Sequence, residues 1–413
     1  MNRRYFLRSS GLALAAFGCG PIGAPGFLRR ALAESPSPGR SGKVLVTLFL
    51  RGAADGLSLV APTFESRYAA LRPNLALKRA GQDGGVLPLE GGFGLHPALA
   101  ALHPLYRDGS LAIVHAVGSP NPTRSHFDAQ DFLESGTPGV KSTRDGWMNR
   151  ALSASPGEPS AFRAVAFAPT LPRSLAGAAP AVALSSLSDF DLGAGPAGAG
   201  ASASFESLYG GAVDAALKNA GTETFEALRT LRGKGIPSLP VANGAEYPAS
   251  PLGRRLRGIA QLVRGDVGLE AAFTDASGWD THAGQGAAQG QLANRLLDLG
   301  NALAAFAKDL GPRLADVCVV VMTEFGRTVR ENGTRGTDHG HGSVLFVLGG
   351  SVAGGRVHGK WPGLSDADLF EGRDLAVTTD LRDVLAEVLA RHLRISSPRI
   401  FPGHTAVRTG ILS

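Results

Sequence analysis

The stretch GTDHGHG, Gly336 to Gly342, places one carboxylate and two imidazoles within seven residues. Carboxylate oxygens and imidazole nitrogens are the side-chain atoms that hold many divalent metal ions in proteins. The glycines allow the backbone to approach a ligand closely, and they suit a plain tight turn equally well. The stretch alone fits either a metal site, with His339 and His341 as ligands and Asp338 beside them, or a glycine-rich turn.

The pair Asp280 and His282 in GWDTH offers two more candidate ligands. Residues two apart in an extended segment point to the same side, which chelation of one ion requires. The alternative is a turn in which the Asp280 side chain bonds the nearby backbone. Spacing alone leaves both interpretations open.

Ser125, Glu324 and Arg327 could serve catalysis or only local structure. Ser125 precedes a predicted short helix, and with Asp128 three residues later it fits a helix capping box. A hydroxyl at a helix N-terminus is also well placed as a nucleophile toward an anionic substrate. Glu324 and Arg327, in TEFGRT, could be a solvated acid with its neutralising neighbour or members of a site.

These residues need a scaffold that brings them together, and four apolar runs predict its strands. Runs without polar alternation indicate strands buried on both faces, as in a parallel or mixed sheet covered by helices. His115 lies inside one run and is predicted to be a core residue. The runs are residues 44–50, 111–117, 317–322 and 343–348, and residues 267–273 form a weaker fifth candidate.

Two amphipathic helices are predicted beside these strands. Between Leu292 and Leu310, leucine and phenylalanine recur at spacings of four and three residues, and a glycine and a proline end the pattern. A second helix follows residues 378–380, with Thr379 as its expected N-cap. The fold class is therefore α/β, and we expect a three-layer α/β/α arrangement around a mostly parallel central sheet.

In such sheets, ligands collect beyond the carboxyl ends of the strands. Several segments with carboxylates, imidazoles or hydroxyls follow predicted strands, and GTDHGHG directly precedes the last one. We therefore expect these side chains to meet at one edge of the sheet. Those that follow strands include Asp55, Ser125, His126, Asp280, His282, Glu324 and Arg327.

The N-terminus is typical of a twin-arginine export signal that ends at about residue 33. It carries Arg3 and Arg4, then a short apolar stretch and a small-x-small cleavage site. Residues 11–28 contain two prolines and five glycines, so no stable membrane anchor is expected. We expect the twin-arginine machinery to export the chain to the periplasm or out of the cell.

The leader also accounts for most of the positive charge. The chain has a net charge of +6, and removal of the five arginines of the leader leaves about +1. No nucleic-acid binding is therefore predicted. The remaining chain, residues 34–413, is expected to form a single domain, with flexible loops near residues 193–204 and 233–250, where glycine, alanine, serine and proline are frequent.

Long motifs in the chain resemble domain-of-unknown-function family 1501 (DUF1501). They are RGAADGLS, GLHPALAAL, VHAVGSPNPTRSHFDAQDFLESGTPG, GWDTH, TEFGRTVRENGTRGTDHGHG and TTDLRDVLAEVL, and they extend over essentially the whole chain after the leader. Members of that family are typically bacterial proteins with twin-arginine signals, grouped with the alkaline phosphatase and sulfatase superfamily. The resemblance implies an alkaline-phosphatase-like fold.

The same resemblance implies roles for individual residues. Ser125 would be the nucleophile, and Arg327 or Arg124 would hold an oxyanion of the substrate. One metal site would use Asp280, His282 and His339, and the other would use Asp55, Ser125 and Glu324.

Phe325 departs from the superfamily pattern, because it stands where a phosphatase has a metal-binding histidine. The resemblance implies that His126, Asp338 or His341 would replace the missing ligand, and His341 is the expected replacement.

The sequence thus predicts an exported metal-dependent hydrolase of phosphate or sulfate esters, acting on a small anionic ester. It would use a serine nucleophile and one or two divalent ions, with zinc, manganese, calcium and magnesium as the candidates. The alternative is a non-catalytic periplasmic binding or assembly protein that keeps the fold, and Phe325 favours it. Whether the chain is an enzyme stays open at this level.

Overall fold

The four strong apolar runs form four neighbouring strands at the centre of one sheet. The computed structural model describes residues 42–155, 162–187 and 233–413, so the predicted leader and the 193–204 loop lie outside the described residues. Within the described part, the sheet has nine strands. In spatial order these are β11 (Val357–His358), β5 (Leu111–Gly118), β10 (Ser343–Gly349), β9 (Val317–Thr323), β1 (Val44–Arg51), β8 (Ala271–Ser277), β6 (Ala164–Phe167) and β7 (Val182–Leu184), and β12 (Thr379–Asp380) also pairs with β5.

The sheet is mostly parallel, as the sequence predicts. Strand β10 runs antiparallel to both of its neighbours, β5 and β9, and the other strand pairs of this sheet are parallel. The N-terminal end of β10 therefore lies at the same edge as the C-terminal ends of β1, β5, β8 and β9. This reversal brings the GTDHGHG stretch to the edge where ligands are expected.

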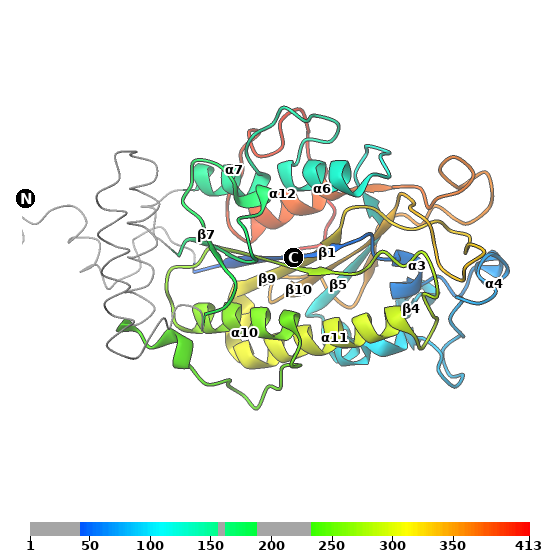
Figure 1. The fold of residues 1–413 in the computed structure, drawn as a ribbon, viewed down its shortest axis with the longest axis horizontal. Helices are drawn as coiled ribbons and strands as arrows, with labels where there is room; N and C mark the ends of the chain where they lie inside the picture. The colour runs from blue at the N-terminus through cyan, green and yellow to red at the C-terminus, as the bar shows by residue number, and fades with distance from the viewer. Residues whose placement is uncertain (1–41, 156–161, 188–232) are drawn as a thin grey trace, which may run out of the picture. The chain divides into compact units, whose positions relative to one another are not determined.

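Helices cover both faces of the sheet, which confirms the three-layer α/β/α class. In Figure 1, α10 (Pro251–Arg264) and α11 (Gln291–Leu310) lie below the sheet, and α6 (His126–Ser135), α7 (Trp147–Ala154) and α12 (Leu381–Arg391) lie above it. Alternate residues of β1 enter the two cores, with Val46 and Leu48 on one side and Leu45 and Phe49 on the other. The run lacks polar alternation because both faces are buried.

The remaining elements are short. They are α3 (Gly56–Leu59), α4 (Ser66–Leu71), α5 (His103–Arg107), the 3-10 turns η1 (Glu90–Gly92), η2 (Pro97–Leu102), η3 (Arg173–Leu175), η5 (Ile236–Ser238) and η6 (Gly311–Asp316), and a small sheet of β2 (Val60–Ala61), β4 (Gly94–Leu95) and β3 (Leu87–Pro88). Apart from η5, residues 234–250 form turns and irregular structure. Among the described helices, none is long and apolar enough to cross a membrane.

Two boundary predictions are wrong. Strand β8 begins at Ala271 rather than at residue 267, because Asp266 and Gly268 have positive φ and pairing with β1 begins at Leu45 and Ala271. The N-cap of α12 is Asp380, whose side chain accepts from the backbone N–H of Arg382. Thr379 belongs instead to β12.

Candidate metal centre

The loops after β9 and before β10 pair with each other beyond the sheet. The backbone N–H of Gly340 donates to the carbonyl of Gly326 over 2.8 Å, and that of Thr328 donates to Asp338 over 2.9 Å. A Cβ atom on Gly326 or Gly340 would overlap the facing backbone. Glycine is therefore required here for close backbone approach, and this pairing sets Glu324 and Arg327 beside the GTDHGHG stretch.

Three imidazoles surround one carboxylate oxygen at this edge. The Oδ1 atom of Asp280 lies 3.0 Å from His282 Nε2, 3.3 Å from His339 Nε2 and 3.6 Å from His126 Nε2. The Nε2 atoms of His282 and His339 are 2.9 Å apart. The structure thus brings together the predicted set of Asp280, His282 and His339, and His126, one of the replacements considered, joins them.

The tautomer of each ring follows from its second nitrogen. Every Nδ1 atom faces an oxygen that can only accept, so Nδ1 carries a proton, and the Nε2 atom of each ring is the one that faces Asp280 and is available to a metal ion. The accepting atoms are Glu324 Oε1 for His126 at 2.8 Å, Asp338 Oδ1 for His282 at 2.9 Å, and the carbonyl of Arg124 for His339 at 2.8 Å.

This donor set fits a divalent metal ion. The Nε2 atom of His126 is buried and has no hydrogen-bond partner among the described residues. Lone pairs of His282 and His339 that face each other at 2.9 Å repel unless a cation or a proton lies between them. Atoms that share one tetrahedral zinc ion, each bound at about 2.0 to 2.2 Å, lie roughly 3.3 to 3.6 Å apart. Asp280 Oδ1 lies at this separation from His339 Nε2 and His126 Nε2, at 3.3 and 3.6 Å, and the donor atoms of these three residues all lie within 4.8 Å of one another. His282 Nε2 lies closer to two of them, at 2.9 Å from His339 Nε2 and 3.0 Å from Asp280 Oδ1.

Arg327 supports the centre from inside the protein. Its buried guanidinium donates to Asp280 Oδ1 over 2.5 Å and to the backbone carbonyls of Gly52 and Ala53. Burial raises the pKa of Asp280, but the hydrogen bond and the charge of Arg327 lower it by more. The pKa of Asp280 therefore lies below its usual value. The structure therefore places this predicted catalytic residue behind Asp280, where it keeps the carboxylate ionised.

Glu324, a predicted metal ligand, lies behind His126. Its side chain is fully buried, and Oε1 accepts from the backbone N–H of Gly52, from His126 Nδ1 and from Gln130 Nε2. Burial raises the pKa of Glu324, whereas the hydrogen bonds from His126 and Gln130 lower it below its usual value. A carboxylate in this place orients the imidazole and increases its basicity.

Asp55, another predicted ligand, lies outside the cluster. It is fully buried and forms a two-point ion pair with Arg72 at 2.6 and 2.9 Å. Its Oδ2 also accepts from Ser58 Oγ and Gln285 Nε2. Burial raises the pKa of Asp55, and the opposing charge of Arg72 lowers it below its usual value. The carboxylate is thus occupied by internal partners.

Phe325 and His341 do not supply ligand atoms to the cluster. The ring of Phe325 stacks on His126 with centroids 5.0 Å apart and lies 5.2 Å from the ring of His339. It therefore forms an apolar wall against two of the imidazoles. His341 is buried against Phe370, with centroids 4.5 Å apart, and burial lowers its pKa.

Ser125 caps α6, as the sequence predicts. Its side chain is exposed and accepts from the backbone N–H of Asp128 over 3.5 Å, a long contact for a hydrogen bond. The residues on both sides of it are tied to the cluster, because the backbone carbonyl of Arg124 accepts from His339 and His126 is one of the three imidazoles.

A family model described as "Protein of unknown function (DUF1501)" matches residues 109–401. The chain belongs to this family. The matched range contains every member of the DUF1501 protein's imidazole and carboxylate cluster, namely His126, Asp280, His282 and His339. Asp55 lies before it.

The DUF1501 protein is also similar to solved structures, at low identity. The C-terminal periplasmic domain of EcEptC from Escherichia coli, in complex with Zn, gives 10% identity, a TM-score of 0.34, and coverage of 75% of this chain and 74% of that one. The lipoteichoic acid synthase LtaP from Listeria monocytogenes gives 10% identity and a TM-score of 0.30, with coverage of 76% of this chain and 66% of that one. The phosphonate monoester hydrolase of Agrobacterium radiobacter gives 11% identity and a TM-score of 0.33, with coverage of 89% of this chain and 79% of that one. A comparison with curated proteins found no match.

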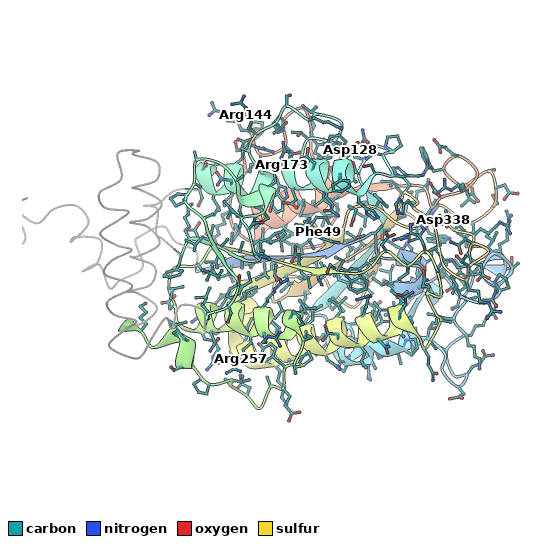
Figure 2. The ribbon with its side chains drawn as sticks, in the orientation of Figure 1. Phe49, Asp128, Arg144, Arg173, Arg257 and Asp338 are labelled. Carbon is teal, nitrogen blue, oxygen red and sulfur yellow. The ribbon has the colours of Figure 1, made fainter. Side chains whose placement is uncertain are left out.

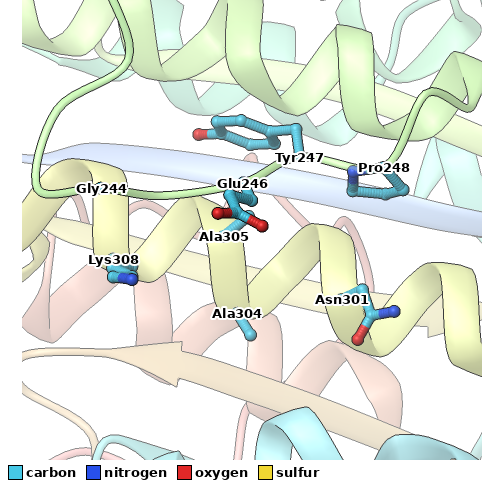
Figure 3. A pocket seen from close by; sticks show the side chains of 8 residues that line it. All are labelled: Gly244, Glu246, Tyr247, Pro248, Asn301, Ala304, Ala305 and Lys308. Carbon is cyan, nitrogen blue, oxygen red and sulfur yellow. The ribbon is translucent and has the colours of Figure 1, made fainter.

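Two concave surfaces differ in their relation to the cluster. A cleft of about 230 Å³ is lined by Asp338 and Arg373, and these residues contact His282 and the His339 carbonyl. Figure 2 labels Asp338 at the right-hand end of the view, away from Phe49 within the sheet. A larger groove of about 600 Å³, shown in Figure 3, lies between Tyr247 and α11 and has no imidazole in its lining. The smaller cleft is the one that adjoins the cluster.

Proposed function

We propose that this DUF1501 protein is a metal-dependent hydrolase of phosphate or sulfate esters with one divalent ion. The ion would be held by Asp280, His126, His282 and His339. The observation that carries the proposal is the buried Nε2 atom of His126, which has no hydrogen-bond partner among the described residues and lies 3.6 Å from Asp280 Oδ1, beside the Nε2 atoms of His282 and His339.

The donor set favours zinc over manganese, calcium or magnesium, since the last three suit carboxylate, carbonyl and water ligands. Three of the four donors are imidazole nitrogens, whereas calcium and magnesium prefer oxygen ligands. When bound, the ion would supply Lewis-acid polarisation of an ester oxygen.

The chain's own residues have distinct roles in this proposal. Glu324 and Asp338 hold two of the imidazoles in the tautomer that presents Nε2. Arg327 keeps Asp280 ionised from the buried side. The exposed hydroxyl of Ser125, at the N-terminus of α6, is the proposed nucleophile, since backbone N–H groups at a helix start favour an anionic group.

We also propose export by the twin-arginine machinery to the periplasm or out of the cell. The proposal rests on the paired arginines and the apolar stretch of residues 1–33. A fusion of these residues to a reporter should reach the periplasm, and replacement of Arg3 and Arg4 by lysine should retain it in the cytoplasm. Export of the lysine variant would contradict the proposal.

A second candidate function is a non-catalytic binding or assembly protein with one structural ion. The carboxylates of Asp55 and Glu324 are both occupied by internal hydrogen bonds. Phe325 packs directly on the imidazoles. Within the described residues, the cluster therefore offers ligands for one ion, and this observation favours the second candidate.

Elemental analysis of the full chain beside His339→Ala tests the metal centre. We expect one equivalent of ion in the wild type and a large loss in the variant. An equal ion content in both proteins would overturn the ligand assignment.

Turnover of a panel of phosphate, phosphonate and sulfate esters separates the two functions. Ser125→Ala should lose turnover and keep the ion. Ser250→Ala is the matched control, because Ser250 caps α10 in the same way by accepting from Gly253 over 3.0 Å. Full turnover in Ser125→Ala would refute the nucleophile, and a wild type with one ion and no turnover would support the second candidate.

A further inference from the structure

We propose that Gln285 is a positioning residue of the metal centre, which holds both ligand-bearing loops in register through one buried amide. The inference rests on the metal centre proposed above and deepens it. Gln285 is fully buried and contributes no ligand atom of its own.

The carbonyl oxygen of the Gln285 amide bonds to both loops. It accepts from Thr281 Oγ1 over 2.7 Å and from Thr337 Oγ1 over 2.8 Å. Thr281 stands between the ligands Asp280 and His282, and Thr337 lies two residues before His339. Both threonines are buried, so neither hydroxyl has bulk water as an alternative partner.

The buried Asp55 fixes which way the amide faces. The Nε2 group of Gln285 donates to Asp55 Oδ2 over 2.8 Å and lies 3.2 Å from Ser58 Oγ. A carboxylate accepts and cannot donate, so a flipped amide would place two acceptors against each other. The charge of Asp55 is balanced by Arg72, whose two-point contact holds the carboxylate in place.

Backbone hydrogen bonds also join the two loops close to the Gln285 side chain. The N–H of Thr337 donates to the carbonyl of Thr281 over 3.1 Å, and that of Gln285 donates to Arg335 over 2.9 Å. Gln285 thus closes a buried layer beneath the ligands. Partners behind the ligands typically change metal affinity by about 10 to 100-fold when they are removed.

The test compares Gln285→Leu with Gln261→Leu in the full chain. Gln261 is a matched control, because it is also a buried glutamine with two amide contacts, to the carbonyls of Pro237 and Leu239 beside α10. Zn²⁺ affinity, the visible spectrum of bound Co²⁺ and the Tm of the metal-free protein are measured for each. We expect Gln285→Leu to bind Zn²⁺ about 10 to 100-fold more weakly and to alter the Co²⁺ spectrum. Gln261→Leu should lower only the Tm.

Thr281 provides a second pair of variants if Gln285→Leu does not fold. Thr281→Val removes the hydroxyl and keeps the shape, whereas Thr281→Ser keeps the hydroxyl. We expect Thr281→Val to weaken Zn²⁺ binding by about tenfold and Thr281→Ser to retain it.

Wild-type affinity and spectrum in Gln285→Leu or in Thr281→Val would overturn the positioning role. A wild-type chain that binds neither Zn²⁺ nor Co²⁺ would overturn the proposed metal centre itself. The two failures are therefore distinguishable.

Discussion

Asp55 and Asp280 follow neighbouring strands, β1 and β8, and each contacts a buried arginine, yet their surroundings differ. The side chain of Asp55 is 0% exposed, and its carboxylate oxygens contact Arg72, Ser58 and Gln285 instead of the cluster. The side chain of Asp280 is 43% exposed, and its Oδ1 faces three imidazoles as well as Arg327.

The difference shows what a carboxylate needs in order to act as a ligand. Both acids are ionised, and both have a guanidinium partner. Only Asp280 combines an accessible oxygen with neighbouring lone pairs that no internal donor occupies. A buried carboxylate saturated by its partners contributes to the scaffold instead. Four predictions test this contrast.

The largest effect is expected for Arg72→Leu, which leaves Asp55 charged and buried without its partner. Loss of one member of a buried ion pair typically costs about 3 to 5 kcal/mol in the free energy of unfolding. Urea unfolding measures it. Arg67→Leu is the control, because Arg67 pairs with the exposed Asp366, and it should cost less than about 1 kcal/mol. Equal losses of unfolding free energy in Arg72→Leu and Arg67→Leu would show that burial does not distinguish the two ion pairs.

A second effect is expected for His115, a buried histidine whose ring is saturated by internal partners as the carboxylate of Asp55 is, and it is tested through the pH dependence of stability. His115 is buried, and both ring nitrogens are used, by the Val60 carbonyl and the Ala116 N–H. This confirms it as a core residue, and burial lowers its pKa to about 4 from 6.5. As pH falls from 6.5 toward 4, only the unfolded chain takes up this proton, so about 3 kcal/mol of stability is lost. The contribution is fully present above pH 6.5.

Urea unfolding across this pH window, for the wild type and His115→Gln, measures the contribution. The glutamine does not titrate, so the difference between the two unfolding free energies should change with pH in this window. A difference that stays constant would mean that the pKa of His115 is the same in the folded and in the unfolded chain.

A smaller effect is expected for Glu324→Gln, which keeps the shape beside His126 and removes the charge. Zn²⁺ affinity should fall about tenfold, the lower end of the range for partners of metal-bound histidines. Titration calorimetry measures it. Glu387→Gln is the control, because Glu387 accepts from the backbone N–H groups of Thr409 and Gly410, away from the centre. Unchanged affinity in Glu324→Gln would argue against His126 as a ligand.

The smallest effect is expected for the stability of Ser125→Ala. Removal of an N-cap typically costs about 1 kcal/mol in unfolding free energy, and Ser250→Ala should show that loss. The Ser125 contact is longer, at 3.5 against 3.0 Å, so its loss should cost less. Thermal unfolding of the two variants compares them. A larger loss at Ser125 would give this residue a structural role at the edge of the sheet.

Local patterns were sufficient to predict the central strands and the helix α11. The runs at residues 44–50 and 317–322 become β1 and β9 because burial of both faces requires continuous apolar sequence. The antiparallel direction of β10 could not be predicted, since strand direction depends on how the chain connects in space.

The site was predictable where ligands lie in short motifs. The segments GWDTH and GTDHGHG meet at one edge of the sheet, as their places at strand ends predict, and Asp280, His282 and His339 are the set that the family resemblance implies. The surroundings of Asp55 were not predictable, because its pairing with Arg72 is a tertiary contact that spacing does not reveal. His126 carried one signal in the sequence, its place directly after the predicted N-cap Ser125 at a strand end.

The reversed strand β10 also has a consequence for how the centre forms during folding. With β9 it makes a pair of strands that follow each other in the chain, so Glu324, Arg327, Asp338 and His339 meet within the one connection between Thr323 and Ser343. Closing this connection costs less entropy than closing the longer ones to the other ligands. Asp280 and His126 come from distant parts of the chain and arrive only when β8 and β5 have joined the sheet. One ligand, His339, and the supporting residues Glu324, Arg327 and Asp338 therefore belong to a local structure, and the complete ligand set exists only in the finished sheet.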